Sequence, residues 1–205
     1  MVIEVEKLGK KYAKEWIFRN LDARFDAKFS YAITGPNGSG KSTLIQILSG
    51  AFLPTEGTIK YSLLGNSILE DQVYSHLDII TPYLELIEEF TLEEFLSFHF
   101  KFKKLKSGIS LNDFIALVYL ENDRSKLIQN FSSGMKQRLK LGLAFFSQSE
   151  ICLLDEPTSN LDEQGIAWYL KHIKAILAEK LVIISSNQLK EYDFCDKIIH
   201  IPDFK

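Results

Sequence analysis

The chain has 205 residues, of which 46% are hydrophobic and 25% are charged, so it can bury a substantial core as one domain. Its 24 basic and 27 acidic residues give a net charge of -3, which argues against a broad electrostatic grip on nucleic acid, and no nucleic-acid partner is expected. Cys152 and Cys195 lack CxxC spacing, so neither a disulfide framework nor a zinc site is expected, and both cysteines should be reduced and buried.

The first third of the chain predicts strands followed by one helix. MVIEV alternates with the period of a strand, and residues 19–35 contain two more strand patterns on either side of a turn at 26–28. The segment KSTLIQILSG then places apolar residues at helical spacing and ends at Gly50, a good carboxyl-terminal cap. A glycine-rich loop therefore joins a strand to a helix.

The middle of the chain predicts a helical insertion. A turn at Pro54–Gly57 leads into a short strand, and LDIIT (77–81) reads as a buried strand that stops at Pro82. TLEEFLSFHFKF then begins with a capping box, and LNDFIALVYL is a second helical candidate. The basic run KFKKLK (101–106) is interpreted as a solvated helix face, with contact to an acidic partner as the alternative.

The last third returns to alternating elements. A helix in SSGMKQRLKLGLAFF precedes the apolar strand ICLLDEP, and a helix in GIAWYLKHIKAILAEK precedes the strand LVIISS. Strands that alternate with helices indicate a parallel sheet. We therefore predict an α/β fold with an N-terminal antiparallel β region, a mostly parallel sheet and an inserted helical lobe. The single domain, 1–205, would have its core in 1–82 and 138–205 and its lobe at about 83–137.

The loop from Gly35 to Ser42 fits the pattern GxxxxGKS of a phosphate-binding loop. Its glycines allow a tight turn in which backbone N–H groups face an anion at a helix N-terminus. Lys41 would reach the β- and γ-phosphates, and the Ser42 hydroxyl would ligate Mg²⁺. The predicted nucleotide-binding residues of this loop are Gly35, Pro36, Asn37, Gly38, Ser39, Gly40, Lys41, Ser42 and Thr43.

A second element supplies carboxylates. At the end of ICLLDE, Asp155 is placed to hold Mg²⁺ or one of its waters, and Glu156 is the candidate general base. An acidic strand end is common by itself, but its pairing with a phosphate loop predicts a nucleotide hydrolase of the P-loop type.

These residues resemble the ATP-binding cassette (ABC) ATPases over nearly the whole chain. FSSGMKQR (131–138) is similar to the signature motif of that family, and SNLD (159–162) is similar to its D-loop. The segments LSGAFLPTEGTI and CDKIIHI are also similar to its connecting segments.

The resemblance implies ATP and Mg²⁺ as ligands and a second nucleotide-binding domain, a homodimer or heterodimer partner, that closes head to tail on the first. It implies that Ser132, Ser133 and Gly134 contact the nucleotide of the opposite subunit, with Asp162 in the D-loop nearby. Tyr12 falls where the family stacks an aromatic ring on adenine, with Trp16 as the alternative.

Two positions depart from the family pattern. Tyr83 stands where the family has a glutamine, and Asn187 stands at the position of the switch histidine. Asparagine can donate a hydrogen bond to a phosphate oxygen but cannot carry a proton as histidine does. Slow hydrolysis, with Lys41, Glu156 and Asn187 as the catalytic residues, is therefore expected.

The leading interpretation is the ATPase subunit of a membrane transporter. The N-terminus lacks a signal-peptide pattern, and no run of about 18 apolar residues occurs, so the chain is expected to be cytoplasmic and to reach the inner or plasma membrane through an integral membrane partner. A groove near Tyr83, Leu84 and Glu85 would dock that partner. The alternative is a soluble ABC ATPase without a transport role, or a regulatory module that responds to nucleotide.

Overall fold

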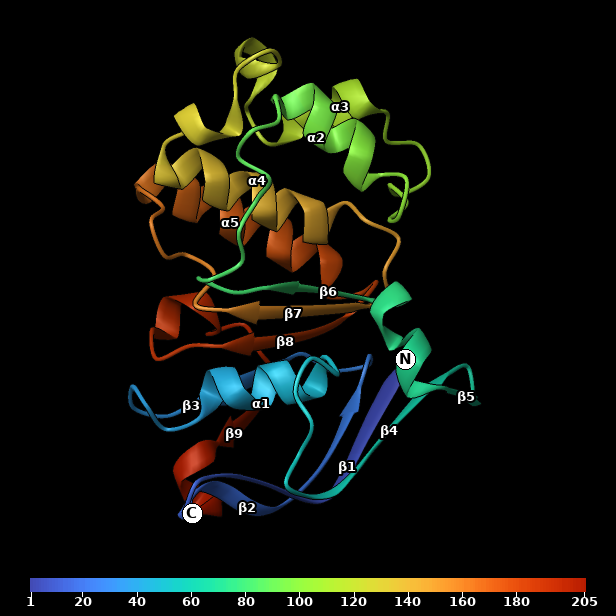
Figure 1. Cartoon of the computed structure of the whole chain (residues 1–205), viewed down its shortest axis with the longest axis vertical. Helices are drawn as coiled ribbons and strands as arrows, with labels where there is room; N and C mark the ends of the chain where they lie inside the picture. Colours follow the sequence, from blue (N-terminus) through green and yellow to red (C-terminus); the bar gives the residue numbers. More distant parts are fainter.

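The computed structural model describes residues 1–205 and contains two β-sheets with helices packed on them (Figure 1). The antiparallel sheet has the strand order β2-β1-β4-β5 and is formed by β1 (Val2–Tyr12), β2 (Glu15–Asp26), β4 (Glu56–Leu63) and β5 (Asn66–Ile68). The parallel sheet has the order β6-β7-β8-β3-β9 and is formed by β3 (Tyr31–Thr34), β6 (Leu77–Ile80), β7 (Ile151–Asp155), β8 (Leu181–Ser185) and β9 (Lys197–His200). The predicted α/β fold is confirmed.

The helices separate into those between the sheets and those outside them. One helix, α1 (Lys41–Leu48), lies between the two sheets, whereas α4 (Ser133–Phe145) and α5 (Glu163–Ile176) cover the opposite face of the parallel sheet (Figure 1). Beyond α4 lie α2 (Leu92–His99) and α3 (Leu111–Leu117). The remaining helical segments are short 3-10 turns: η1 (Glu70–Ser75), η2 (Glu121–Asp123), η3 (Ile128–Asn130), η4 (Leu189–Glu191) and η5 (Ile201–Phe204).

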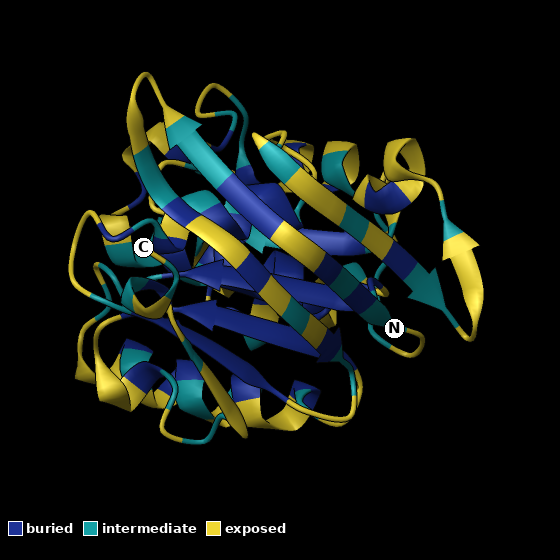
Figure 2. Cartoon of the chain, turned by 90° about the horizontal axis from the view of Figure 1, so that it is seen from below, coloured by how far each residue is buried: buried dark blue, intermediate teal, exposed yellow.

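The parallel strands contribute to two apolar cores at once. In β7, Ile151 and Leu153 pack with α1 and the antiparallel sheet, while Cys152 and Leu154 pack with α4, α5 and the residues of α2 and α3. This division follows from the alternation of side chains along a strand. Figure 2 shows the consequence: the central parallel strands β3, β7 and β8 are buried along their length, whereas the antiparallel strands alternate between buried and exposed residues.

The basic run KFKKLK corrects one prediction, because it is a strap against the core and not a solvated helix face. Helix α2 ends at His99, and residues 101–106 then cross to the amino-terminal edge of the parallel sheet. There the Lys103 ammonium donates to the carbonyls of Tyr74 (2.7 Å) and Leu77 (2.6 Å). It also lies 3.6 Å from the carboxylate of buried Asp78. A buried carboxylate needs such a partner, which the charge pattern of the run did not reveal.

Two smaller findings concern expected properties of the chain. Both cysteines are free, as predicted, but only Cys152 is buried and Cys195 is half-buried. Burial raises the pKa of each thiol to about 12, so neither is a thiolate near neutral pH.

Among the helices of the structure, none combines the length and the apolar character required for a membrane span.

The parallel sheet brings three predicted segments to one edge. Ile33 of β3 and Asp155 of β7 are both in register with Ser185 of β8. Because the three strands are parallel, the phosphate loop after β3, the acidic turn after β7 and the segment of Asn187 after β8 all begin at the same carboxyl edge.

Candidate functional site

The glycine-rich loop lies between β3 and α1 and has a backbone that requires glycine. Gly35 and Gly40 have φ angles of 145° and 108°, which side-chain-bearing residues rarely adopt. A Cβ on Gly40 would lie 2.3 Å from the Ile17 side chain, and one on Gly35 would lie 2.7 Å from the Ser39 hydroxyl. The loop therefore keeps its tight course only with glycine at both positions.

The side chains of this loop are arranged for an anion. The Lys41 ammonium is held by its own loop, where it donates to the carbonyls of Gly35 (2.9 Å) and Pro36 (3.4 Å). The Ser39 hydroxyl is buried and has no hydrogen-bond partner. Asn37 is exposed at the loop surface, and α1 begins directly at Lys41 with its free N–H groups. A phosphate would satisfy these groups, so the loop fits a nucleotide.

The acidic turn follows β7 in an unusual conformation. Asp155 is almost completely buried, and its carboxylate accepts a hydrogen bond of 2.7 Å from the Ser185 hydroxyl. Glu156 has a φ of 47°, and its N–H donates to the Ser185 carbonyl at 2.8 Å. Such left-handed backbone is held in place by its surroundings and is typical of functional sites. Ser185, the last residue of β8, is a supporting residue that the sequence pattern alone did not single out.

The donors near this turn suit Mg²⁺. Ser42 is exposed in the first turn of α1, and Asp155 ends the strand. No group of three or more histidine, cysteine, aspartate and glutamate side chains converges in the structure. Mg²⁺ is ordinarily held by one or two protein oxygens together with phosphate and water, so one hydroxyl and one carboxylate fit this ion.

Asn187 joins the end of β8 to the phosphate loop. Its amide Nδ2 donates to the Asn37 Oδ1 atom at 3.0 Å. Asn37 and Asn187 are thus brought together from positions far apart in the sequence. Tyr83, in contrast, is 86% exposed after β6 and has no hydrogen bond in the structure.

The signature segment forms the start of α4. The Ser132 hydroxyl caps the helix by accepting from the N–H of Met135 at 3.2 Å, and Ser133 and Gly134 follow in the first turn. A Cβ on Gly134 would lie 3.2 Å from the Asn160 carbonyl, so the start of α4 abuts the D-loop. In that loop Asp162 caps α5 by accepting from the N–H of Gly165 at 2.8 Å.

The signature segment and the phosphate loop of one chain lie on opposite faces of the parallel sheet, with α4 on one side and α1 on the other (Figure 1). Ser132, Ser133 and Asp162 are exposed to solvent. One chain therefore does not place its signature residues over its own phosphate loop.

The aromatic candidates for base stacking differ in their availability. Tyr12 is 46% exposed at the end of β1, and the Lys10 ammonium lies 5.1 Å from its ring centre. Trp16 already has Lys11 at 5.4 Å and Arg19 at 4.5 Å from its ring centre. Tyr12 is exposed and Trp16 only partly exposed, so Tyr12 is the more accessible ring for a base.

Comparisons with known proteins agree with this geometry. A model of the family described as ABC transporter matches residues 18–159. The uncharacterised ABC transporter ATP-binding protein YybJ of Bacillus subtilis is 37% identical over 168 residues, which cover 82% of this chain and 76% of that protein. The lantibiotic transport ATP-binding protein SrtF of Streptococcus pyogenes is 32% identical over 209 residues, 99% of this chain and 85% of that protein.

The dimeric structure of MJ0796, a bacterial ABC transporter cassette, is similar in fold, with a TM-score of 0.81. Its identity is 21%, and the match covers 97% of this chain and 93% of that one. The phosphate loop, the acidic turn and the signature helix thus occur together in a chain that the family description matches over well more than half its length. The chain belongs to the ABC transporter family, as an ATP-binding protein with the ABC ATPase fold.

Proposed function

We propose that this chain hydrolyses ATP to drive a membrane transporter, and that it works as one of two nucleotide-binding domains paired head to tail. The observation that carries the proposal is the meeting of the phosphate loop, the Asp155–Glu156 turn and Asn187 at one edge of the parallel sheet. The relatives with transport names support the same role.

Binding would begin with a change of partner for Lys41. Its ammonium, now hydrogen-bonded to two loop carbonyls, would turn to the β- and γ-phosphates, and the unsatisfied Ser39 hydroxyl would gain an acceptor. The backbone N–H groups of residues 37–43 would face the phosphate oxygens. Tyr12 would stack on the adenine ring.

Hydrolysis would use the acidic turn. Ser42 and Asp155 would hold Mg²⁺, which, when bound, neutralises charge on the transferred phosphate. Glu156 would accept a proton from the attacking water, and Ser185 would keep the Asp155 carboxylate oriented through its hydrogen bond. Asn187 would donate its amide to the γ-phosphate, after leaving Asn37.

Turnover is proposed to be slow because two charge-stabilising positions are altered. Loss of one preorganised donor in a catalytic site commonly costs ~10²–10³ in rate. Asn187 keeps a donor but has no ionisable group, and Tyr83 lacks the amide that the family glutamine provides. Binding of ATP should therefore be affected less than its hydrolysis.

The second nucleotide-binding domain would contribute Ser132, Ser133 and Gly134 from the start of its α4, with Asp162 beside them. Ser132, Ser133 and Asp162 are exposed in the single chain, and α4 lies across the parallel sheet from α1 and the phosphate loop. MJ0796 is described as a dimeric cassette. We further propose that 1–82 and 138–205 act as the core and that about 83–137 act as the lobe. A groove near Tyr83 would receive the membrane partner, which would place the chain at the cytoplasmic side of the membrane.

Two measurements test this function. Calorimetry should detect MgATP binding by the intact chain and its loss in Lys41→Ala, with melting curves to check that the variant folds. A photoreactive amino acid at Tyr83 should crosslink to an integral membrane protein in cells. MgATP binding without any membrane crosslink would favour the soluble ABC ATPase; absence of MgATP binding by the folded chain would contradict both functions.

A further inference from the structure

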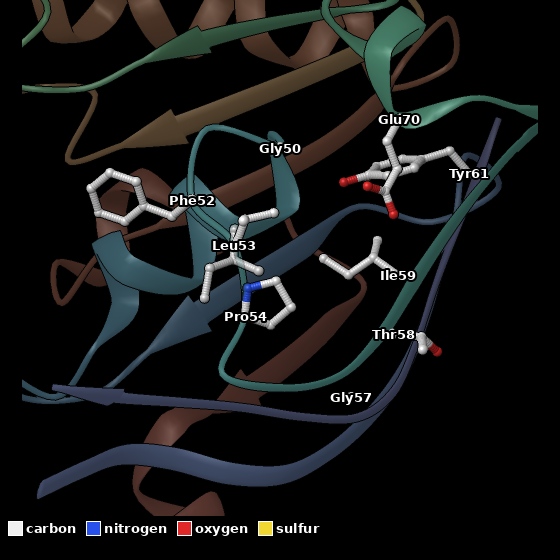
Figure 3. A pocket seen from close by; sticks show the side chains of 10 residues that line it. Gly50, Phe52, Leu53, Pro54, Gly57, Thr58, Ile59, Tyr61 and Glu70 are labelled. Carbon is white, nitrogen blue, oxygen red and sulfur yellow. The ribbon is translucent and has the colours of Figure 1, made fainter. Parts of the chain in front are cut away.

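A hollow of about 320 Å³ lies beside the carboxyl end of α1, apart from the nucleotide residues described above. We call it the α1–β4 pocket. Figure 3 shows it between the segment that follows α1 and the strand β4, with Ile59 directed from the strand toward Leu53 and Pro54. Its larger apolar lining residues are Ile47, Phe52, Leu53, Pro54, Ile59 and Tyr61.

One carboxylate, that of Glu70, lies at the edge of this apolar pocket. Glu70, at the start of η1, is exposed and lines the pocket, and its side chain overlaps that of Tyr61 in the view of Figure 3. The Glu70 carboxylate forms no hydrogen bond or ion pair in the structure, and neither does the carboxylate of its neighbour Asp71. Burial, and after it the charge of Glu70, raises the pKa of Tyr61. The nearby cation, Lys10, is committed to the Leu53 carbonyl at 2.8 Å.

The pocket adjoins a second hollow. A larger cavity of about 570 Å³ shares Gly50 and Glu70 with it and continues along β6 to Leu84, next to Tyr83. Large apolar side chains are exposed along this path, among them Leu53 at 74% and Tyr74 at 71%. Exposed apolar surface of this kind, next to unpaired carboxylates, is typical of a surface that a partner covers.

We propose that the α1–β4 pocket receives an arginine or lysine side chain from a cytoplasmic segment of the membrane-spanning partner, as a contact additional to the groove near Tyr83. The aliphatic stem of such a residue would pack on Leu53 and Ile59, and its charged end would bind Glu70. This inference rests on the proposed transport function. The chemistry favours a basic amphipathic segment because an acidic one would meet Glu70 and Asp71 with like charge.

The experiment uses the full chain in cells that contain its membranes. A photoreactive amino acid at Leu53 should crosslink to an integral membrane protein, and mass spectrometry should map the adduct to a segment between membrane spans, within one helical turn of an arginine or lysine. The same amino acid at Leu64, which is 91% exposed on the β4–β5 turn, is the matched control and should give no such adduct.

The carboxylate is tested separately. Glu70→Gln should lower the yield of the Leu53 adduct about tenfold, as expected for loss of a charge-assisted hydrogen bond, whereas Glu121→Gln, another exposed carboxylate on η2, should leave it unchanged. Glu70→Arg should abolish the adduct, and replacement of the mapped basic residue by glutamate should restore it. MgATP affinity should be the same in all of these variants.

The possible outcomes separate this inference from the function on which it rests. If Tyr83 crosslinks to a membrane protein but Leu53 crosslinks to a second copy, to a soluble protein or to nothing, the pocket inference is wrong and the transport function stands. A Leu53 adduct that does not respond to Glu70→Gln or Glu70→Arg also overturns it. If neither position reaches a membrane protein, the transport function itself fails.

Discussion

Asn187 shows how a single side chain connects two distant parts of the site. Its amide reaches Asn37 in the phosphate loop across 150 positions of sequence, and in the proposed mechanism it turns from Asn37 toward a phosphate. The same side chain therefore holds the resting loop and has no ionisable group to offer during hydrolysis.

Replacement of Asn187 by histidine tests its role in the rate. Asn187→His should raise steady-state ATP hydrolysis by about tenfold to a hundredfold, since it supplies the ionisable donor that asparagine lacks, and loss of a charge-stabilising donor commonly costs ~10²–10³ in rate. Asn187→Ala should lower hydrolysis and leave MgATP binding largely intact. The neighbouring Gln188→His is the control, and an equal response at both positions would contradict a specific role for Asn187.

At this scale the sequence singled out candidate residues that the fold brings to one edge of the sheet, but it did not predict their contacts. The spacing of Gly35, Gly40 and Lys41 is local and identified the loop directly. The Asp155–Ser185 and Asn37–Asn187 hydrogen bonds join residues from different strands and loops. They depend on the order of strands in the sheet, which a single sequence does not specify.

Among the elements, the strands and long helices follow their hydrophobic patterns closely, but the insertion does not. Its second helix was predicted through Leu120 and ends at Leu117, since Tyr119 adopts a left-handed backbone with φ 59°. The strap at 101–106 was misinterpreted because one of its lysines, Lys103, pairs with a buried carboxylate, Asp78, that lies on another element. Tertiary contacts of this kind override local charge patterns.

Helix α4 approaches α3 closely at Gly142. A Cβ there would lie 2.3 Å from the Val118 side chain, so Gly142→Ala should lower the free energy of unfolding by about 2 kcal/mol through overpacking. In a Val118→Ala background the same change should cost much less. Urea unfolding of the four proteins in this cycle measures the coupling, and additive effects would contradict the close approach.

His99, in the last turn of α2, predicts a pH dependence of stability. Burial lowers its pKa, and burial also lowers that of His172. The unfolded chain therefore binds these protons more readily, so the free energy of unfolding should fall as the pH drops through 6.5 and below. The buried Nε2 atom of His99 has no hydrogen-bond partner. If it were protonated, its N–H group would have no acceptor.

The measurement is urea unfolding between pH 7.5 and 5.5. His99→Gln and His172→Gln should each flatten the pH profile in part, and the double variant should flatten it further. Glu94 and Asp113, whose capping hydrogen bonds lower their pKa values, titrate below this window. A slope unchanged in the double variant would show that other groups cause it.

For the whole molecule, the separation of α1 and α4 by the parallel sheet predicts shared sites between two chains. Lys41→Ala alters one phosphate loop, and Gly134→Asp alters one signature segment. Each variant alone should be nearly inactive, but an equal mixture should recover about a quarter of wild-type ATPase activity, because half of the dimers keep one intact composite site. Melting curves check folding, and a mixture without activity would contradict sites shared between copies of this chain.

The two cores that meet in β7 have a thermodynamic consequence. Alternate residues of one strand belong to opposite cores, so neither core can lose its order while the strand stays in place. Heating should melt the protein in a single cooperative transition, with equal calorimetric and van't Hoff enthalpies. A substitution that destabilises the layer of α4 and α5 would then destabilise the distant antiparallel sheet just as much. Two resolved heat-absorption peaks would contradict such joint unfolding.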